Sequence, residues 1–246
     1  MGVAATRSVD RIRDRPAVAV VLAGGTGTRM ATEVPKQLLE LAGRPMLEYS
    51  IAAFDAAPGI DRVLLVMAPG FRSAAERIVA AGPYRKVRKI LDGGATRTDS
   101  TRRALAALRQ ELAGEWDVLF HDAARPLVDR QTIADCLAVL RTAAAVTVAM
   151  PTSDTILEVD DGLITDIPNR HRLWRCQTPQ GFRLATLQRA YELADADVGA
   201  GFQATDDCSV VLRYLPGVPI AVVPGSTRNL KVTEPADLAM AEALLA

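Results

Sequence analysis

The sequence predicts a doubly wound α/β fold with a mostly parallel, twisted sheet, and three observations support this class. Ala17–Ala23 is a continuous apolar run, as in a strand buried on both faces of a sheet. Strand-like and helix-like segments then alternate along most of the chain, as in folds with right-handed βαβ crossovers. Polar motifs also follow several predicted strands, which is where such sheets bind their ligands.

The individual elements follow from the spacing of apolar residues. After Ala17–Ala23, the predicted strands are Arg62–Met67, Val87–Leu91, Trp116–His121, Ala145–Met150 and Ile220–Val223. Helical spacing is clearest in Asp99–Leu112, where Leu105, Leu108 and Leu112 share one side. The other predicted helices are Pro45–Ala57, Phe71–Ala81, Thr132–Thr142, Leu184–Leu193, a segment near Asp206–Leu212, and Pro235–Leu245.

The alternation of strands and helices breaks between Pro151 and Thr178. There Thr155–Val159 and Leu163–Ile167 flank Asp160-Asp161-Gly162, a hairpin signal. We therefore expect an inserted β-arm at residues 151–178 within a single domain of residues 17–246. Residues 1–16 are polar and charged, so we expect a disordered leader.

Composition limits the possible functions. The 246 residues are 49% hydrophobic and 24% charged, which fits one globular core. The formal net charge is zero and only 4% of residues are aromatic, which argues against nucleic-acid binding. No apolar stretch is long enough to span a membrane and no apolar signal core is present, so we expect a cytoplasmic protein.

The segment from Ala23 to Lys36 carries the most chemical information. Its glycines allow a close approach of the backbone to a ligand, and Arg29 and Lys36 add positive charge. This combination suits a triphosphate whose α-phosphorus is attacked. Met30 stands where a dinucleotide signature needs its third glycine, and no Walker sequence is present. A dinucleotide oxidoreductase is therefore disfavoured, and a tight structural turn alone would not explain the two cations.

Two further motifs follow predicted strands. Asp92-Gly93-Gly94 precedes Ser100 at the start of a helix, which is compatible with a simple helix cap or with a pocket for the edge of a base. In His121-Asp122-Ala123-Ala124-Arg125-Pro126, Asp122 is placed to hold a metal directly or through water, and Arg125 to hold a phosphate. The alternative is an internal ion pair between Asp122 and Arg125. His121 itself is expected to be structural.

Three other segments are ambiguous on their own. Thr205-Asp206-Asp207 starts a predicted helix and is at least a good N-cap. Lys231 lies near a strand end, where a lysine is usually solvated, but its loop opens on the same side of the sheet. Arg170 lies in the return limb of the arm, from which it could complete the site of a second subunit.

Together these blocks resemble the 2-C-methyl-D-erythritol 4-phosphate cytidylyltransferases. The blocks are AGGTGTRM, PKQ, DGG with a following R and DS, HDAARP, SDTI, QTPQGF, TDD and NLKVT, and they run in the family's order from about Ala17 to the C-terminus. The resemblance implies a Rossmann-like sheet and a homodimer formed through the arm. It also implies transfer of CMP from CTP to 2-C-methyl-D-erythritol 4-phosphate, with Mg²⁺ present and pyrophosphate released. This reaction belongs to isoprenoid precursor biosynthesis.

The resemblance implies a role for each matching residue. Arg29 and Lys36 would stabilise the α-phosphate, and Lys231 would position the polyol phosphate together with Arg170 from the partner's arm. The CTP pocket would comprise Ala23, Gly24, Gly25, Gly27, Gly94 and Ser100. The polyol or its phosphate would contact Asp122, Arg125, Thr155 and Thr205. Asp122 is also the candidate metal ligand, although Mg²⁺ would be held mainly by the CTP phosphates.

Three positions depart from the family's usual pattern. Gly24 stands where the methylerythritol enzymes commonly have alanine, Ala95 where an acidic residue often follows the second glycine, and Asp207 where glutamate is usual. The Ala-Gly-Gly form also resembles the ribitol-5-phosphate cytidylyltransferases, so another polyol phosphate is the alternative substrate. A nucleotide-binding protein without catalysis is a second alternative, but it would predict missing cations.

Overall fold

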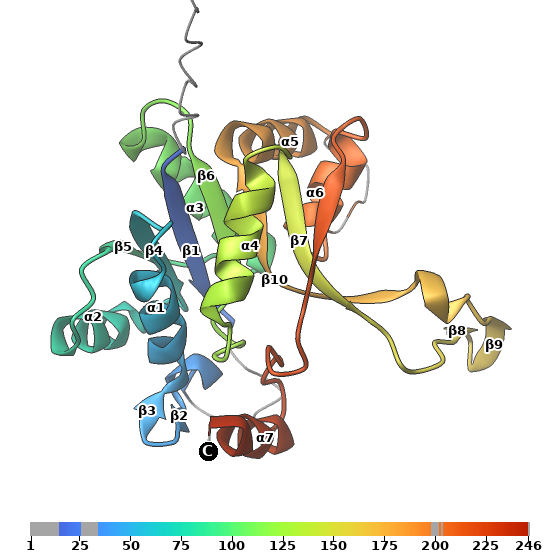
Figure 1. The fold of residues 1–246 in the computed structure, drawn as a ribbon, viewed down its shortest axis with the longest axis horizontal. Helices are drawn as coiled ribbons and strands as arrows, with labels where there is room; N and C mark the ends of the chain where they lie inside the picture. Colours follow the sequence, from blue (N-terminus) through green and yellow to red (C-terminus); the bar gives the residue numbers. More distant parts are fainter. Residues whose placement is uncertain (1–14, 26–33, 198–201, 203, 246) are drawn as a thin grey trace, which may run out of the picture.

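The computed structural model describes residues 15–25, 34–197, 202 and 204–245. Its centre is a seven-stranded sheet in the order β11-β7-β10-β6-β1-β4-β5 (Figure 1). These strands are β1 (Ala17–Ala23), β4 (Arg62–Met67), β5 (Val87–Asp92), β6 (Asp117–Asp122), β7 (Ala145–Pro151), β10 (Trp174–Arg183) and β11 (Ile220–Pro224). Only β10 runs antiparallel to its neighbours β6 and β7. The predicted mostly parallel α/β sheet is therefore confirmed.

Both faces of this sheet are covered by helices: α1 (Met46–Ala56), α2 (Arg72–Ala81), α3 (Arg97–Glu111), α4 (Arg130–Leu140), α5 (Leu184–Ala196) and α6 (Asp207–Tyr214). A further helix, α7 (Pro235–Leu245), lies outside these two layers. Helices α1, α2 and α4 share one apolar core with the sheet, in which Phe54 and Ile133 are fully buried. Helices α3, α5 and α6 share the other, around Phe120 and Leu187. Since every residue of β1 is buried, its unbroken apolar run is explained.

A third, smaller core brings two distant segments together. A short helix, η2 (Lys36–Leu38), leads into the hairpin of β2 (Glu40–Leu41) and β3 (Arg44–Pro45). Leu41 and Met46 pack there against Val232 and against Ala241 of α7. The segment carrying Lys36 and the segment carrying Lys231 are thus fixed beside each other.

The inserted arm is shorter than predicted. Trp174–Arg183 forms β10, in which Trp174 lies opposite Pro151 and Gln177 opposite Val148 of β7. The return limb therefore joins the central sheet at Trp174, and the arm itself spans residues 152–173. It contains β8 (Glu158–Asp160) and β9 (Leu163–Asp166) and extends away from the rest of the molecule (Figure 1). At its turn, Asp161 and Gly162 have φ angles of 46° and 78°, as a tight hairpin requires.

The last two residues of the predicted leader belong to the folded body. Arg15 forms an ion pair with Asp117, with Nε 2.9 Å from Oδ1, and the carbonyl of Pro16 accepts from the N–H of Asp117. The rest of the predicted leader, residues 1–14, lies outside the described residues. Among the residues that are described, no helix is both long and apolar enough to cross a membrane.

Candidate active site

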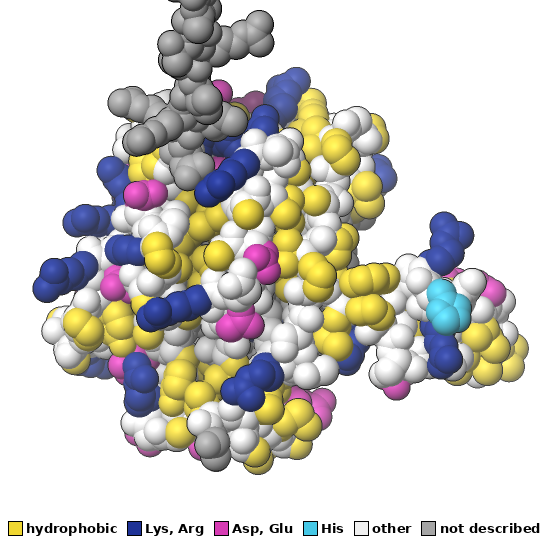
Figure 2. All heavy atoms as spheres, viewed as in Figure 1, with side chains coloured by type: hydrophobic (Ala, Val, Ile, Leu, Met, Phe, Trp, Pro, Cys, Tyr) yellow, Lys and Arg dark blue, Asp and Glu magenta, His cyan; other side chains and the backbone are white. Residues whose placement is uncertain are grey.

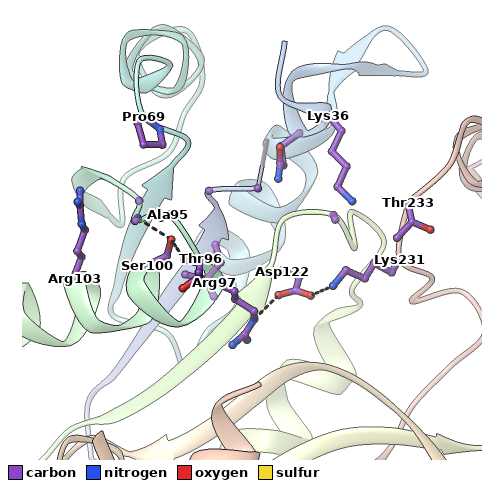
Figure 3. A pocket seen from close by; sticks show the side chains of 17 residues that line it. Lys36, Pro69, Ala95, Thr96, Arg97, Ser100, Arg103, Asp122, Lys231 and Thr233 are labelled. Carbon is purple, nitrogen blue, oxygen red and sulfur yellow. Dashed lines mark hydrogen bonds and ion pairs between the residues drawn. The ribbon is translucent and has the colours of Figure 1, made fainter. Parts of the chain in front are cut away.

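A cavity of about 590 Å³ opens at the carboxyl ends of β1, β5 and β6 (Figure 3). Its lining gathers seven of the sequence-predicted site residues, which come from five separate segments of the chain. These seven are Gly24, Gly25, Lys36, Gly94, Ser100, Asp122 and Lys231. Ala23 is fully buried at the end of β1, directly before the two lining glycines. The expectation that the polar motifs share one cleft is therefore confirmed for these seven residues.

The turn after β5 is organised by the start of α3. Thr96 and Asp99 form a capping box, in which each side chain accepts from the other residue's backbone N–H. The Ser100 hydroxyl accepts from the N–H of Gly94 at 3.1 Å and donates to the carbonyl of Thr96 at 3.0 Å. The interpretation of this motif as a helix cap is thus right. Ser100 acts on the pocket by holding the Gly94 backbone in place.

Two glycines, Gly24 and Gly93, lie where the ends of β1 and β5 approach Ser100. A Cβ at Gly24 would lie 2.9 Å from the Ser100 Oγ, and a Cβ at Gly93 would lie 2.8 Å from the same atom and 3.2 Å from the carbonyl of Met67. The glycines therefore let two strand ends meet around one buried hydroxyl. Gly24, the position that departs from the family pattern, consequently faces the Ser100 side of the cavity and not the Asp122 side.

Lys36 lies across the cavity from this turn (Figure 3). It starts the η2 helix, and its Nζ donates to the carbonyl of Val232 at 2.7 Å. Val232 in turn donates its N–H to the carbonyl of Ala124 in the turn after β6. The Lys36 ammonium is thus held beside the segment that carries Lys231.

Asp122, at the end of β6, lies between two cations. Its Oδ2 is 2.7 Å from the Nζ of Lys231, and its Oδ1 is 3.3 Å from the Nε of Arg97. Burial by itself would raise the pKa of the Asp122 carboxyl, but Arg97 and Lys231 together hold it well below its ordinary value. Asp122 is therefore ionised, and among the described residues its ion pairs are with Arg97 and Lys231 and not with Arg125.

His121 has a structural role that fixes the end of β6. Its Nε2 lies 3.0 Å from the carbonyl of Arg125, and its Nδ1 lies 3.0 Å from the Thr178 hydroxyl. Because a carbonyl only accepts, Nε2 carries the proton and Nδ1 accepts from Thr178, which itself accepts from the N–H of Asp122. Complete burial lowers the pKa of His121 to about 4, so the ring is neutral near pH 7. The expectation of a structural histidine agrees with this geometry.

Arg125 lies behind the cavity wall and is absent from the lining. Its Nη1 donates to the carbonyl of Asn229 at 2.8 Å and its Nη2 to the carbonyl of Cys176 at 3.1 Å. Arg125 is only 9% exposed. The sequence-based role in binding the polyol phosphate is therefore not supported by its position, because its guanidinium instead ties the turn after β6 to β10 and to the segment after β11.

Three of the remaining predicted residues, Thr155, Arg170 and Thr205, do not line the cavity of their own chain. Thr155 and Arg170 are exposed on the arm, where the Nη1 of Arg170 is 3.4 Å from the carbonyl of Ser153. Thr205 is exposed just before α6, whose N-cap is Asp206. Gly27 and Arg29 lie outside the described residues.

Arg97 is the main site residue that sequence reasoning did not select. It lines the cavity as the first residue of α3, and its Nη1 lies 2.8 Å from the Oδ2 of Asp207. The positive end of the helix dipole disfavours a cation at this position. An arginine at the start of a helix is therefore unusual, and this is the local feature of the sequence that points to Arg97. The other lining residues not assigned before are Leu22, Gln37, Pro69, Gly93, Ala95, Thr96, Arg103, Ala124 and Thr233.

The donors for a metal are few. Among the cavity-lining residues that the structure describes, Asp122 has the only carboxylate, and both of its oxygens are paired with cations. The described residues also contain no group of three or more His, Cys, Asp or Glu placed to hold a metal ion. The protein atoms described here thus form a cationic cavity wall with one neutralised carboxylate.

Comparison with known proteins identifies the family. Residues 17–246 match the sequence profile of 2-C-methyl-D-erythritol 4-phosphate cytidylyltransferase. The enzyme of that name from Thermobifida fusca (strain YX) is 50% identical over 94% of each chain. A bifunctional ribulose 5-phosphate reductase/CDP-ribitol pyrophosphorylase from Haemophilus influenzae is 38% identical, and the match covers 92% of this chain but 48% of that protein.

Solved structures agree with the sequence comparison. The 4-diphosphocytidyl-2C-methyl-D-erythritol synthase of Anaerococcus prevotii superposes with a TM-score of 0.81 at 28% identity, over 94% of this chain and 99% of that one. The 2-C-methyl-D-erythritol 4-phosphate cytidylyltransferase of Thermus thermophilus gives 0.71 at 32% identity, over 92% and 97% of the two chains. This chain therefore belongs to the 2-C-methyl-D-erythritol 4-phosphate cytidylyltransferase family.

Proposed function

We propose that the chain transfers CMP from CTP to 2-C-methyl-D-erythritol 4-phosphate, giving 4-diphosphocytidyl-2-C-methyl-D-erythritol and pyrophosphate. The observation that carries this proposal is one cavity that joins a glycine-lined pocket to a cationic wall. The pocket is formed by Gly24, Gly25 and Gly94, and the wall by Lys36 and Lys231. Such a cavity suits a nucleoside triphosphate at one side and an anionic acceptor at the other.

The reaction needs no nucleophile from the protein. An oxygen of the acceptor's phosphate forms a bond to the α-phosphorus of CTP. The bond from that phosphorus to the oxygen bridging to the β-phosphorus breaks, and pyrophosphate leaves with the electron pair. Negative charge gathers on the α-phosphate oxygens during this exchange, so fixed cations lower the barrier by positioning and charge stabilisation.

The roles of the cavity residues follow from their places. The backbone of Gly24, Gly25 and Gly94 would contact the nucleoside, and Lys36 would stabilise the α-phosphate together with Arg29. Lys231, held by Asp122, would bind the acceptor's phosphate. His121 is neutral and buried and is not a proton carrier in this scheme.

Mg²⁺ would enter as part of the substrate. A metal bound directly to Asp122 would share its carboxylate with Arg97 and Lys231, which is electrostatically unfavourable. We therefore assign the ion to the phosphate oxygens of an Mg–CTP complex. Turnover should then follow the concentration of Mg–CTP when total Mg²⁺ and CTP are varied independently. Dependence on free Mg²⁺ at constant Mg–CTP would contradict this assignment.

The arm would supply the remaining residues from a second copy of the chain. Its exposed apolar side chains are Ile156, Leu157, Val159, Leu163, Ile164 and Ile167, and Figure 2 shows apolar side chains at its tip. Thr155 and Arg170 lie on this arm and away from their own cavity. In a homodimer that exchanges arms, they would complete the partner's site. We further propose that the enzyme acts in the cytoplasm, where CTP is available.

A ribitol-phosphate cytidylyltransferase is the second candidate, favoured by the similarity to the Haemophilus influenzae protein. The experiment is to incubate the protein with CTP and Mg²⁺, add either methylerythritol phosphate or ribitol 5-phosphate, and follow pyrophosphate release. Release with the first acceptor at a much higher kcat/KM supports the proposal, and a preference for ribitol 5-phosphate supports the alternative. Absence of release with either acceptor would overturn both.

A further inference from the structure

We propose that Arg97 is a positioning residue, which holds Asp122 and, through it, Lys231 in the geometry needed to bind the acceptor's phosphate. The inference rests on the proposed function, because Lys231 has that role only in a phosphate-acceptor enzyme. It concerns a residue that the sequence motifs left without a role.

The geometry forms a continuous chain of contacts that ends at the cavity. The Tyr191 hydroxyl donates to Asp207 at 2.7 Å, and Asp207 pairs with Arg97 at 2.8 Å. Arg97 pairs with Asp122 at 3.3 Å, and Asp122 with Lys231 at 2.7 Å. Figure 3 shows Arg97, Asp122 and Lys231 in line along the cavity wall. The Lys231 end of this chain reaches solvent, since the Lys231 side chain is 41% exposed, whereas that of Asp207 is fully buried.

The far end of the chain is rigid. Asp207 is the first residue of α6, and its N–H donates to the Oε1 of the buried Gln180 on β10 at 3.1 Å. Tyr191 comes from α5, so two helices and the sheet all hold this carboxylate. A charge buried this completely needs a cationic partner, which Arg97 provides.

Arg97 itself is fixed against a local preference. As the first residue of α3 it meets the positive end of the helix dipole, which disfavours a cation. Burial alone would also lower its pKa, but Asp207 and Asp122 raise it above its ordinary value. Its planar guanidinium can face both carboxylates at once, using Nη1 for one and Nε for the other, and a single ammonium group cannot reproduce this.

The functional consequence concerns Asp122. The charged groups that face it are Arg97 from α3, Lys231 from the segment after β11, and Arg125 from the turn after β6. His121 of β6 is also close but neutral. If Arg97 is removed, burial favours the protonated form of Asp122, and a protonated Asp122 attracts Lys231 less. Without Arg97, Lys231 should therefore be held in position less well as the pH falls, and binding of the acceptor's phosphate should weaken at low pH.

The test compares four proteins: wild type, Arg97→Lys, the double variant Arg97→Gln/Asp207→Asn, and Arg109→Gln. The double variant avoids an unpaired buried carboxylate. Arg109→Gln is the matched control, because Arg109 also lies on α3 but is exposed, pairs with Glu192 of α5 and does not line the cavity. Pyrophosphate release with CTP, Mg²⁺ and methylerythritol phosphate is measured between about pH 5 and 9. A carboxyl with a raised pKa would make activity decline at the acid end of this range, the acid limb of the pH profile. CTP affinity is measured separately without acceptor.

For the double variant we expect kcat/KM for the acceptor to fall by about 100-fold, as expected for a displaced positioning group. Its acid limb should move to higher pH while CTP affinity stays near the wild-type value. Arg97→Lys should show an intermediate shift of the acid limb, and Arg109→Gln none. An unmoved acid limb in both Arg97 variants would overturn the inference, and so would a loss confined to CTP affinity. If the double variant does not fold, as judged by circular dichroism, the pH profile of Arg97→Lys decides. Lack of turnover by the wild type would instead refute the proposed function.

Discussion

The Nζ of Lys231 lies 2.7 Å from the Oδ2 of Asp122, although 109 residues separate them in sequence. Asp122 ends the central strand β6, whereas Lys231 follows the edge strand β11. The contact therefore fixes a flexible side chain of the outer segment to the centre of the sheet. A lysine that looks solvated in sequence is in this way directed into the cavity.

Removing this cation should impair use of the acceptor. For Lys231→Met we expect kcat/KM for methylerythritol phosphate to fall by about 100-fold or more, equivalent to roughly 2.7–4 kcal/mol for one stabilising donor. Steady-state pyrophosphate release measures this. Lys89→Met is the control, since Lys89 pairs with Glu111 outside the cavity lining. Equal losses in the two variants would argue against a specific role for Lys231.

Lys36 should act on the chemical step. We expect Lys36→Ala to lower kcat by roughly 2.7–4 kcal/mol of transition-state stabilisation while the protein stays folded, and Arg29→Ala to do the same. Lys36 also donates to the carbonyl of Val232, so circular dichroism and thermal melting must accompany the kinetics. Turnover close to wild type in a folded Lys36→Ala protein would remove Lys36 from the mechanism.

Arg125 should matter for stability more than for binding. Arg125→Ala removes the donor from the carbonyls of Asn229 and Cys176. We expect the free energy of unfolding to fall by roughly 2–6 kcal/mol, because each buried acceptor left unpaired costs about 1–3 kcal/mol. Denaturant unfolding measures this, with Arg189→Ala on the surface of α5 as the control. A stable Arg125→Ala protein with a raised KM for the acceptor would restore the role predicted from the sequence.

Gly24 and Ser100 should be energetically coupled. Gly24→Ala places a Cβ 2.9 Å from the Ser100 Oγ, so this hydroxyl, which accepts from the N–H of Gly94, has to shift. We expect CTP to bind more weakly to Gly24→Ala and to Ser100→Ala. In the double variant the loss of binding free energy should be smaller than the sum of the two single losses, by a coupling energy of about 0.5–3 kcal/mol. Calorimetric titration with CTP measures all three. Strictly additive effects would mean that these residues act independently. If Gly24→Ala instead changed the preference between methylerythritol phosphate and ribitol 5-phosphate, Gly24 would be a determinant of acceptor specificity.

The apolar arm should be necessary for a dimer. Leu163 and Ile164 on β9 are 72% and 59% exposed. We expect Leu163→Asp/Ile164→Asp to halve the mass measured by light scattering and to abolish turnover, since Arg170 would not reach a second site. Leu212→Asp is the control, because Leu212 is 65% exposed on α6 and lies off the arm. A wild-type protein that is monomeric at all concentrations, or a charged arm that still dimerises, would contradict the arm-exchange proposal.

Most of the fold could be predicted because its elements are local patterns. The run Ala17–Ala23 and the strand Arg62–Met67 have the predicted bounds, since strands buried on both faces give unbroken apolar sequences. β10 could not be predicted in the same way. Its sequence, WRCQTPQGFR, contains proline, glycine and polar residues, which are not typical of a central strand. Gln177, Thr178 and Gln180 are nevertheless buried, because residues far away in the sequence form hydrogen bonds with their side chains.

Site residues could be predicted from the sequence where glycines or cations directly follow a predicted strand, as Gly24 and Gly25 do. The pairing of Arg97 could not be predicted, because its acidic partners are Asp122, 25 residues away, and Asp207 on another helix. Asp207 has the sequence context of a helix start, and nothing local distinguishes it from a cap. Arg125 was assigned to a phosphate because the sequence does not reveal its actual acceptors. These are the backbone carbonyls of Asn229 and Cys176, and backbone carbonyls leave no mark in a sequence.

The two ends of the arm leave the sheet from adjacent, paired positions, since Trp174 on β10 lies opposite Pro151 on β7. The arm is therefore the closed tip of an antiparallel strand pair, and changing its length leaves the register of both strands intact. Adding residues to such a loop has only a slowly rising entropic cost. In the proposed arm-exchanged dimer, insertions or deletions between residues 152 and 173 would change the contact with the partner chain and leave the framework of β1, β5 and β6 around the cavity unchanged.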